Sequence, residues 1–394
     1  MRRVNRAFRA TLFAVFISLS PPALSSGVGA AEALDNVVEI FDVARDGDLL
    51  LVPVTLGNQQ FQFVVDTGAS FSLIDSALES YLDLLPGSAQ VNGNRREKRY
   101  HLRAAFVGKS RQLLQGKAIC LDLTQIREAS GYNIRGIIGM DFLRARVVQI
   151  DFDAGKLSIL KELPPSVGRE FRLFYNKFEV PALNIELADG DSVAFVVDTG
   201  MLSDTSLRNY RIDDLLENGR LQLIGPPVLG TTVDGEVRHR IGRLDKFRIG
   251  NFRHEQINVS EGERNQIGLG LLSQYLVTFD FPNDGLYLKP GTRFARPEKS
   301  DRSGLTLRRI DGKLRIKGVA DDSAAASAGL SAGDEVLQID EKDASSLSIF
   351  AANSILATSG ARVRLDVEGL AGRRRVEIRL STSGKAKGHK KGHP

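Results

Sequence analysis

The chain has 394 residues, of which 42% are hydrophobic and 26% are charged, a balance that excludes a mainly disordered protein and allows two or three folded domains. The only cysteine is Cys120, so an intrachain disulfide is excluded. The formal net charge of +5 gathers mainly at the two ends of the chain, and no recognised binding module accompanies it, so we expect no nucleic-acid partner.

Residues 1–33 have the pattern of a signal peptide. Four arginines come first, a short apolar stretch follows at 10–19, and small residues offer candidate cleavage sites at 28–30 and 31–33. The apolar stretch is short for a transmembrane helix, although an uncleaved membrane anchor is the alternative. We therefore expect an exported protein, periplasmic or secreted, that meets a membrane only if the signal is retained.

The tripeptide Asp-Thr-Gly occurs twice, each time directly after the hydrophobic run Phe-Val-Val. The first copy is Asp66-Thr67-Gly68 and the second is Asp198-Thr199-Gly200. Such a run predicts a buried strand, which places the carboxylate at its end on a rigid element. One copy alone would be interpreted as an ordinary turn, but two copies in the same context favour a paired site.

The two tripeptides belong to a longer internal repeat. Their aspartates are 132 positions apart, and two later landmarks recur at a spacing of 129 positions. These landmarks are Gly139 with Gly268 and Asp151 with Asp280. Agreement in motif, order and spacing indicates two similar halves.

Two carboxylates at hydrogen-bonding distance do not both ionise easily, so they share one proton. One is then a base and the other an acid, and together they activate a water molecule and protonate the carbonyl that it attacks. This chemistry requires no metal or other cofactor, and we expect none. Gly68 and Gly200 permit close approach of the loops, and the hydroxyls of Thr67 and Thr199 are able to lock the loops together.

With these motifs the chain resembles the retropepsin- and pepsin-like aspartic proteases over about residues 37–292. The resemblance rests on both tripeptides and on two further signatures, Ile137-Ile138-Gly139 and Gln266-Ile267-Gly268, which in that family pack behind the catalytic loops. It implies a mainly β, bilobal, pseudo-twofold fold with lobes at 37–162 and 170–292, joined near Pro164-Pro165. Both lobes lie in one chain, which implies a monomer with an intrachain site.

The same resemblance implies a function and a set of site residues. The catalytic dyad is Asp66 and Asp198, and the substrate is a peptide or a protein. The residues implied to support the active-site loops are Thr67, Gly68, Ala69, Ser70, Thr199 and Gly200. Acidic to mildly acidic operation is expected, because the pair must retain one proton.

The second half departs from the family pattern at two places. Met201 and Leu202 follow the second tripeptide, where a small residue and a polar residue are usual, and Gln266 replaces a hydrophobic residue. The alternative function is therefore a non-catalytic peptide-binding scaffold with a degenerate cleft. A second alternative is an enzyme that pairs lobes between two chains.

Residues 90–94 and 232–236 follow the two tripeptides and contain Asn-Gly and Asp-Gly, which are hairpin signals. The resemblance implies that such hairpins close over a substrate as flaps, and two ordinary surface hairpins are the alternative. Tyr100 is expected on the descending strand of the first hairpin rather than at its tip.

Residues 301–381 resemble the PDZ domains of bacterial exported proteases. Residues 323–340 predict an Ala-rich helix, a glycine turn and a strand, and residues 349–356 fit a second helix. The resemblance implies a β-barrel with two helices that binds a peptide by strand addition. Its carboxylate-binding loop would be Gly304-Leu305-Thr306-Leu307, with Thr306 where glycine is frequent. A domain that only stabilises the protease is the alternative.

Residues 382–394 are basic and glycine-rich, which predicts a disordered tail. The histidines show no metal-ligand spacing, so no metal site is expected.

Overall fold

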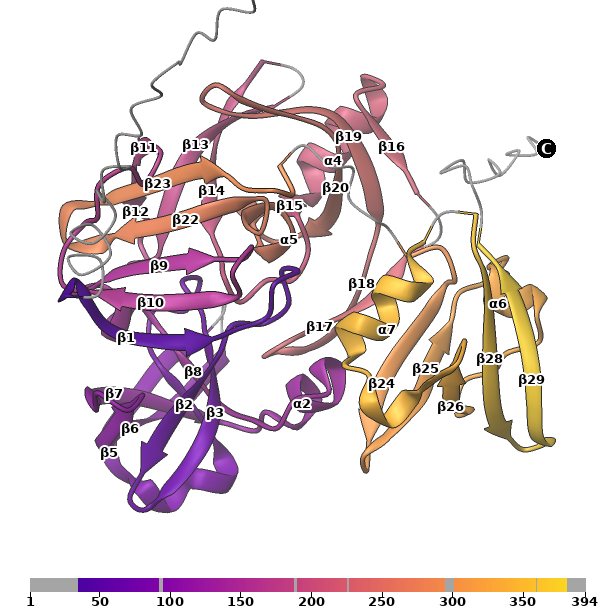
Figure 1. Cartoon of the computed structure of the whole chain (residues 1–394), viewed down its shortest axis with the longest axis horizontal. Helices are drawn as coiled ribbons and strands as arrows, with labels where there is room; N and C mark the ends of the chain where they lie inside the picture. The colour runs from indigo at the N-terminus through magenta and orange to yellow at the C-terminus, as the bar shows by residue number, and fades with distance from the viewer. Residues whose placement is uncertain are drawn as a thin grey trace, which may run out of the picture. The chain divides into compact units, whose positions relative to one another are not determined.

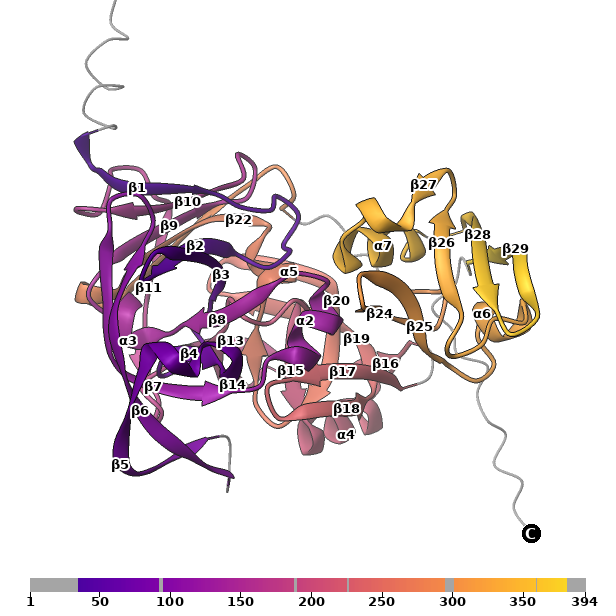
Figure 2. The ribbon, with the colours of Figure 1, turned by 90° about the horizontal axis from the view of Figure 1, so that it is seen from below.

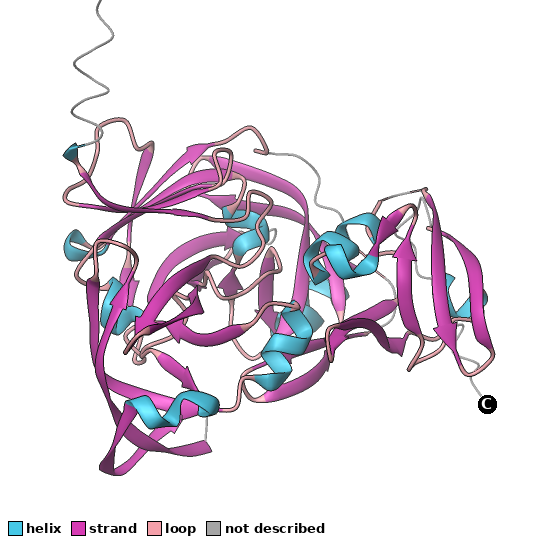
Figure 3. Cartoon of the chain, turned by 60° about the horizontal axis from the view of Figure 1, so that its bottom comes forward, coloured by secondary structure: helices cyan, strands magenta, loops and turns pink. Residues whose placement is uncertain are grey.

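The computed structural model describes residues 35–91, 95–187, 190–224, 227–294, 301–358 and 360–380. The predicted signal segment, the tip of the first hairpin and the predicted tail lie outside the described residues. Within them the chain is mainly β with short helices, as predicted (Figure 3). None of the helices in the described ranges is long and apolar enough to cross a membrane.

The first lobe is a seven-stranded sheet in the order β2-β3-β8-β4-β7-β6-β5. Its strands are β2 (Leu51–Leu56), β3 (Gln59–Val65), β4 (Leu73–Asp75), β5 (Leu82–Val91), β6 (Arg95–Val107), β7 (Gln112–Leu121) and β8 (Ile134–Ile138). Its helical segments are η1 (Ser76–Tyr81), α2 (Thr124–Ser130) and α3 (Met140–Leu143).

The second lobe is an eight-stranded sheet in the order β12-β13-β14-β21-β15-β20-β19-β16, with a separate hairpin β17-β18. Its strands are β12 (Phe174–Tyr175), β13 (Pro181–Leu187), β14 (Ser192–Val197), β15 (Thr205–Arg208), β16 (Leu221–Leu223), β17 (Val228–Thr232), β18 (Gly235–His239), β19 (Ile241–Ile249), β20 (Phe252–Gly262) and β21 (Gln266–Ile267). Its helices are α4 (Asn209–Glu217) and α5 (Leu269–Leu272).

A six-stranded sheet in the order β1-β10-β9-β22-β23-β11 draws strands from both halves of the repeat (Figure 1). Its strands are β1 (Val37–Asp42), β9 (Val147–Asp151), β10 (Lys156–Leu160), β11 (Arg169–Arg172), β22 (Tyr275–Asp280) and β23 (Gly285–Pro290), with η2 (Phe281–Asn283) between the last two. The predicted join at Pro164-Pro165 lies in the loop between β10 and β11.

The centre of this sheet carries the pseudo-twofold axis. β9 and β22 pair antiparallel, and Gln149 lies opposite Thr278, the residue 129 positions later. The spacing is that of the repeat landmarks, so Gln149 pairs with its own equivalent, and its amide donates to the Thr278 hydroxyl at 2.9 Å. An antiparallel pair of equivalent residues requires a twofold relation between the two halves.

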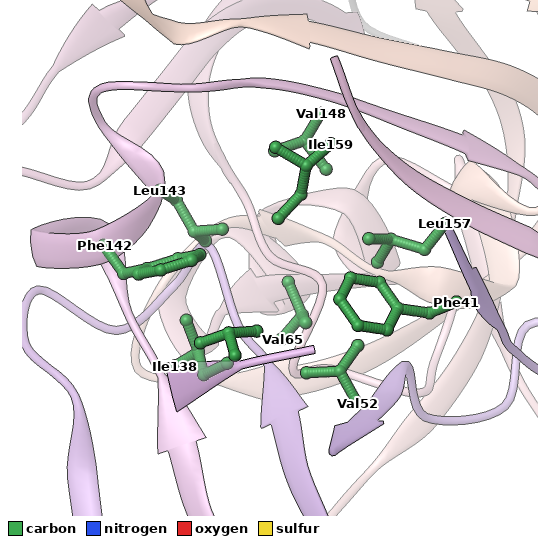
Figure 4. Close-up of a pocket in the computed structure, with 10 residues that line it drawn as sticks. Phe41, Val52, Val65, Ile138, Phe142, Leu143, Val148, Leu157 and Ile159 are labelled. Atoms are coloured by element: carbon green, nitrogen blue, oxygen red, sulfur yellow. The ribbon is translucent and has the colours of Figure 1, made fainter. Parts of the chain in front are cut away.

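The first lobe packs against this sheet with little free space. Apolar side chains from β1, β2, β3, β9 and β10 meet residues at the end of β8 and in α3 around a cavity of about 10 Å³ (Figure 4). A cavity of that size without polar walls does not hold an ordered water, because water needs two or more polar partners. The strand that ends at the first tripeptide is therefore held in a dry core.

The C-terminal domain is a sheet in the order β24-β25-β26-β28-β29 with β27 paired to β26 (Figure 2). Its strands are β24 (Leu305–Ile310), β25 (Lys313–Val319), β26 (Glu335–Ile339), β27 (Lys342–Asp343), β28 (Arg362–Gly369) and β29 (Gly372–Arg379). Its helical segments are α6 (Ala324–Ser327), η3 (Ala344–Ser346) and α7 (Ile349–Leu356). The predicted order of helix, glycine turn and strand is confirmed, and Ser323 caps α6 through its side chain.

Candidate active site

Each aspartate of the repeat follows a central strand of its lobe. Asp66 follows β3, and its N–H donates to Ile138 O at 3.0 Å, while Asp198 follows β14, and its N–H donates to Ile267 O at 2.9 Å. The neighbouring strands β8 and β21 run parallel to β3 and β14. Both carboxylates are thus placed by the same local architecture at the carboxyl end of a buried strand.

The two loops are locked together by their threonines. The Thr67 hydroxyl donates to Val197 O at 2.5 Å, and the Thr199 hydroxyl donates to Val65 O at 2.8 Å. Each hydroxyl also accepts from the N–H of the other threonine, at 3.1 and 3.0 Å. Four hydrogen bonds between buried groups therefore join the lobes directly behind the carboxylates. The sequence-based expectation of a hydroxyl lock agrees with this geometry.

The glycines of the tripeptides bring the carboxylates together. A Cβ atom at Gly68 would lie 2.5 Å from Cγ of Asp198, and one at Gly200 would lie 2.4 Å from Cγ of Asp66. Each glycine N–H also donates to the carboxylate of its own loop, at 2.7 and 2.8 Å. Each carboxylate thus lies over the glycine of the opposite lobe, where no side chain would fit.

The pKa values of both carboxyl groups are raised. Desolvation raises the pKa of Asp66 well above its ordinary value, and the charge of Asp198 raises it further. The Asp66 residue is half-buried, and the desolvation acts on its carboxyl group, which lies inward. Desolvation also raises the pKa of Asp198, against hydrogen bonds from Gly200, Asp66 and Gln266 that lower it. Raised pKa values of this kind are expected for two neighbouring carboxyl groups that share one proton.

The two further signatures pack behind the loops, as the resemblance implies. A Cβ atom at Gly139 would lie 2.8 Å from Ala69 O, and one at Gly268 would lie 2.5 Å from Met201 O. Met140 N–H donates to Ala69 O at 2.8 Å, and Leu269 N–H donates to Met201 O at 2.7 Å. The Met201 departure therefore leaves the main-chain contact intact.

Residues 52–142 match the family described as Aspartyl protease, and residues 293–368 match the family described as PDZ domain. The chain contains an aspartyl protease domain and a PDZ domain. The first match covers the first lobe from β2 to α3, and the repeat and the shared sheet extend the same architecture to the second lobe. A comparison with curated proteins found no match.

The remaining departures of the protease domain have different consequences. Ser70 donates through its hydroxyl to Phe178 O, whereas its counterpart Leu202 is exposed and apolar. Gln266 donates through its amide to Oδ2 of Asp198. In the sequence Gln266 is only a departure from the family pattern, and the signal for its role was a polar residue at the first, usually hydrophobic, position of the second signature.

The two predicted hairpins differ in what the structure describes. The first is formed by β5 and β6, and its tip lies outside the described residues. Tyr100 lies on β6, as predicted. Its hydroxyl donates to the Glu79 carboxylate at 2.6 Å, and this hydrogen bond raises the pKa of the phenol to about 12. The second is β17-β18, whose turn is formed by Val233 and Asp234, both without positive φ. Its Asp-Gly pair therefore does not supply the two central turn residues, because Gly235 already begins β18.

A cavity of about 280 Å³ opens beside Phe71, the residue after Ser70. Its walls come from β5, β6 and β7, with Ala118 and Ile119 among the apolar contributors and Arg99 and Lys117 as the charged ones. Among the described residues neither cation forms an ion pair. The cavity therefore combines an apolar wall with two cationic side chains beside the loop of the first tripeptide.

The predicted carboxylate loop of the PDZ domain is already occupied from within. Gly304 N–H donates to the Asp301 carboxylate at 3.2 Å, and Leu305 N–H donates to the Ser303 hydroxyl at 3.1 Å. Thr306 and Leu307 belong to β24, which pairs with β25 and has an irregular register between these two residues. The role of these four residues in peptide binding stays a prediction.

The other reactive side chains of the described residues do not form a second centre. No group of three or more potential metal ligands occurs in the described ranges. Burial raises the pKa of the Cys120 thiol to about 11, which disfavours the nucleophilic thiolate. His254 is buried against the Tyr275 hydroxyl at 2.5 Å, and burial lowers its pKa to about 4, so it serves the core as a neutral side chain.

Proposed function

We propose that the chain is an aspartic endopeptidase that hydrolyses peptide bonds with water activated by Asp66 and Asp198. The observation that carries the proposal is the interlock of the two tripeptide loops, which leaves each carboxylate over the glycine of the opposite lobe. Both lobes come from one chain, which supports a monomer with a complete site. Residues 1–33 support the further proposal of export to the periplasm or the medium.

The geometry supports a mechanism in which the pair acts as acid and base at once. A water molecule held between the carboxyl groups loses a proton to the ionised one while its oxygen attacks the scissile carbonyl carbon. The protonated carboxyl group gives its proton to the carbonyl oxygen, so charge does not accumulate in the transition state. The threonine hydrogen bonds keep the two groups in register during this transfer.

A transition-state mimic separates proteolysis from the scaffold alternative. We expect a statine-containing peptide, whose hydroxyl group imitates the attacked carbonyl, to bind at least about a hundredfold more tightly than the plain peptide of the same sequence. Titration calorimetry near pH 5 measures both affinities. Asp198→Asn should remove the preference and leave plain-peptide binding, whereas equal affinities in the wild-type protein would support the scaffold.

We propose that the cavity beside Phe71 receives a substrate side chain. Its volume of about 280 Å³ fits one large side chain, and Arg99 and Lys117 favour an acidic group at that position. The two cationic side chains lie in a partly enclosed site, where their attraction for an acidic substrate side chain is stronger than at an open surface.

The PDZ domain is proposed to bind a peptide, as its family implies. A specific observation favours a second role within the chain. Helix α2 of the first lobe contacts both β24 and α7, and the described residues from Val37 on form one compact unit. These two elements contact each other, and β24 begins within the loop that the resemblance assigns to peptide binding. The PDZ domain is thereby suited to support the protease domain.

The charged contact in this support is made by Arg308, which is 6% exposed. Its guanidinium donates to the Thr231 hydroxyl at 2.6 Å and lies 3.4 Å from the Glu236 carboxylate. Both partners belong to the hairpin β17-β18. A buried cation stabilises a contact only while it is paired, so this contact ties the hairpin to the PDZ domain.

Arg308→Met tests the supporting role. The substitution keeps an unbranched apolar chain and removes the donors, so we expect faster deuterium uptake across the hairpin, residues 228–239, measured by mass spectrometry. The control Arg315→Met changes an arginine of β25 whose recorded ion pair, with Glu335, stays within the PDZ domain, and it should leave the uptake of the hairpin unchanged. Unchanged uptake in Arg308→Met would leave peptide binding as the only proposed role.

A further inference from the structure

Gln266 breaks the symmetry of the two lobes beside the carboxylates. It pairs with Val196 on β14 in the same register in which Ile137 pairs with Val64 on β3. Gln266 and Ile137 are therefore structural equivalents. One carries a carboxamide and the other a hydrocarbon side chain.

The surroundings of Gln266 orient its carboxamide. The side-chain nitrogen donates to Oδ2 of Asp198, and the side-chain oxygen lies 3.3 Å from the Ser206 hydroxyl, whose shorter hydrogen bond is donated to Arg264 O at 2.8 Å. Ser206 lies opposite Gln266 in the pairing of β15 with β21. The reverse orientation would place the amide oxygen against Oδ2 of Asp198 and would require a proton on that carboxyl group, so the orientation that places the nitrogen there goes with an ionised Asp198.

The glycine and threonine hydrogen bonds around the dyad are matched between the lobes. Gly68 and Gly200 donate at 2.7 and 2.8 Å to the carboxylates of their own loops, and the threonine contacts repeat across the axis. Ile137 has no polar atom in its side chain, so the first lobe lacks the counterpart of the Gln266 donor. Asp66 has in addition a backbone contact from Ala69, and the Gln266 amide is the side-chain donor by which the two environments differ.

An N–H donor stabilises the ionised form of a carboxyl group. The positive charge of Arg264 acts on Asp198 in the same direction. Where two carboxyl groups hold one proton, the group with the additional donor stays ionised and its partner keeps the proton. The hydrogen bond between the two aspartates is then donated by Asp66 and accepted by Asp198.

We propose that Gln266 is a positioning residue that keeps Asp198 ionised and the shared proton on Asp66. Asp198 then takes the proton of the water whose oxygen attacks the peptide carbonyl carbon, and Asp66 gives its proton to the carbonyl oxygen. The roles of base and acid rest on the proposed proteolytic function, whereas the location of the proton does not.

Gln266→Met is the test variant, because methionine keeps the length of the side chain and removes the donor. Without the donor Asp198 ionises less readily, so the acid limb of the profile of kcat/KM against pH should move upward by about one pH unit. At a fixed pH on that limb, kcat/KM should therefore be about tenfold lower than in the wild-type protein. Ile137→Met makes the same replacement at the equivalent position and should leave the acid limb in place. An unmoved limb in Gln266→Met overturns the proposal.

A swap variant separates positioning from packing. Gln266→Ile combined with Ile137→Gln transfers the donor to the first lobe, where it faces Asp66. One carboxyl group of the pair, now Asp66, again has the additional donor and ionises first. The acid limb should therefore return toward its wild-type position. Failure of the swap to restore it, in a protein with wild-type circular dichroism, would assign Gln266 a packing role only. Gln266→Ile alone serves if Gln266→Met does not fold.

The proton is also located without turnover. Protein labelled with ¹³C at aspartate Cγ is titrated by NMR, with the dyad resonances assigned from Asp66→Asn and Asp198→Asn. We expect Asp198 to ionise first in the wild-type protein and the two steps to move closer in Gln266→Met. That order in a protein that cleaves no peptide would remove the proposed function and keep this assignment. The reverse order in an active enzyme would remove the assignment alone.

Discussion

Asp66→Asn is expected to abolish peptide cleavage and to stabilise the folded protein at neutral pH. Loss of the shared proton removes the acid of the pair, so turnover should fall by about a thousandfold or more. The substitution keeps the size of the side chain and the acceptor for Gly68 N–H. Peptide cleavage and thermal unfolding, measured on the same preparations from pH 3 to 8, report both effects.

The sign of the stability change follows from the raised pKa of Asp66. Above pH 4 the unfolded chain releases this proton while the folded protein retains it, so the folded state binds more protons and its stability falls as the pH rises. Asparagine does not titrate. The melting temperatures should therefore be similar at pH 3 and higher in the variant, by a few degrees, at pH 7.

Asp83→Asn is the matched control for this linkage. Asp83 is exposed, and its hydrogen bonds with Arg103 lower the pKa of its carboxyl group. A lowered pKa contributes stability that is present at neutral pH and lost in acid, so its removal should not raise the melting temperature at pH 7. Retained cleavage in Asp66→Asn would remove Asp66 from the dyad. If the melting temperatures of Asp66→Asn and the wild-type protein changed in parallel with pH, the pKa of Asp66 would not be raised in the folded state.

Gly68→Ala is expected to reduce turnover by about a hundredfold, although the substitution neither adds nor removes an ionisable group. The new Cβ atom would lie 2.5 Å from Cγ of Asp198, and contacts this short require a shift of the carboxylate or of the loop. A displacement near 1 Å at reacting groups costs about two orders of magnitude in rate. Overpacking should also destabilise the fold by about 1–3 kcal/mol.

A second glycine provides the control for the added methyl group. Gly318 on β25 also lacks positive φ, and a Cβ atom there would lie 3.8 Å from its nearest neighbour, in Thr306. Gly318→Ala should leave turnover within about twofold of wild type. If Gly68→Ala were as active as Gly318→Ala, the carboxylates would not face each other across the glycines as described.

Short motifs predicted the centre of the site well, because their chemistry is local. The run Phe-Val-Val before each tripeptide predicts a buried strand, and in the structure each strand ends at the valine directly before the aspartate. The repeat spacing of 129 positions proved to be the spacing of the residues that pair across the axis, Gln149 and Thr278. A twofold arrangement is thus encoded in sequence spacing as well as in the tripeptides.

Features that depend on tertiary contacts were not predictable in the same way. Sequence alone does not show that the Gln266 amide reaches Asp198, since the contact depends on the pairing of β14 with β21. The contact of Arg308 with Thr231 joins residues 77 positions apart. The turn at Val233 and Asp234 adopts ordinary negative φ values, although the adjacent Asp-Gly pair favoured a different turn.

Asp66 and Asp198 are proposed to form a working proteolytic dyad within one chain. The most direct measurement is cleavage of a peptide library by the purified protein between pH 3 and 7, identified by mass spectrometry beside Asp66→Asn and Asp198→Asn. Cleavage is expected with the wild-type protein alone, strongest at acidic pH and enriched in sites with an acidic residue near the cut bond. Absence of cleavage at every pH, or equal cleavage by either variant, would contradict it.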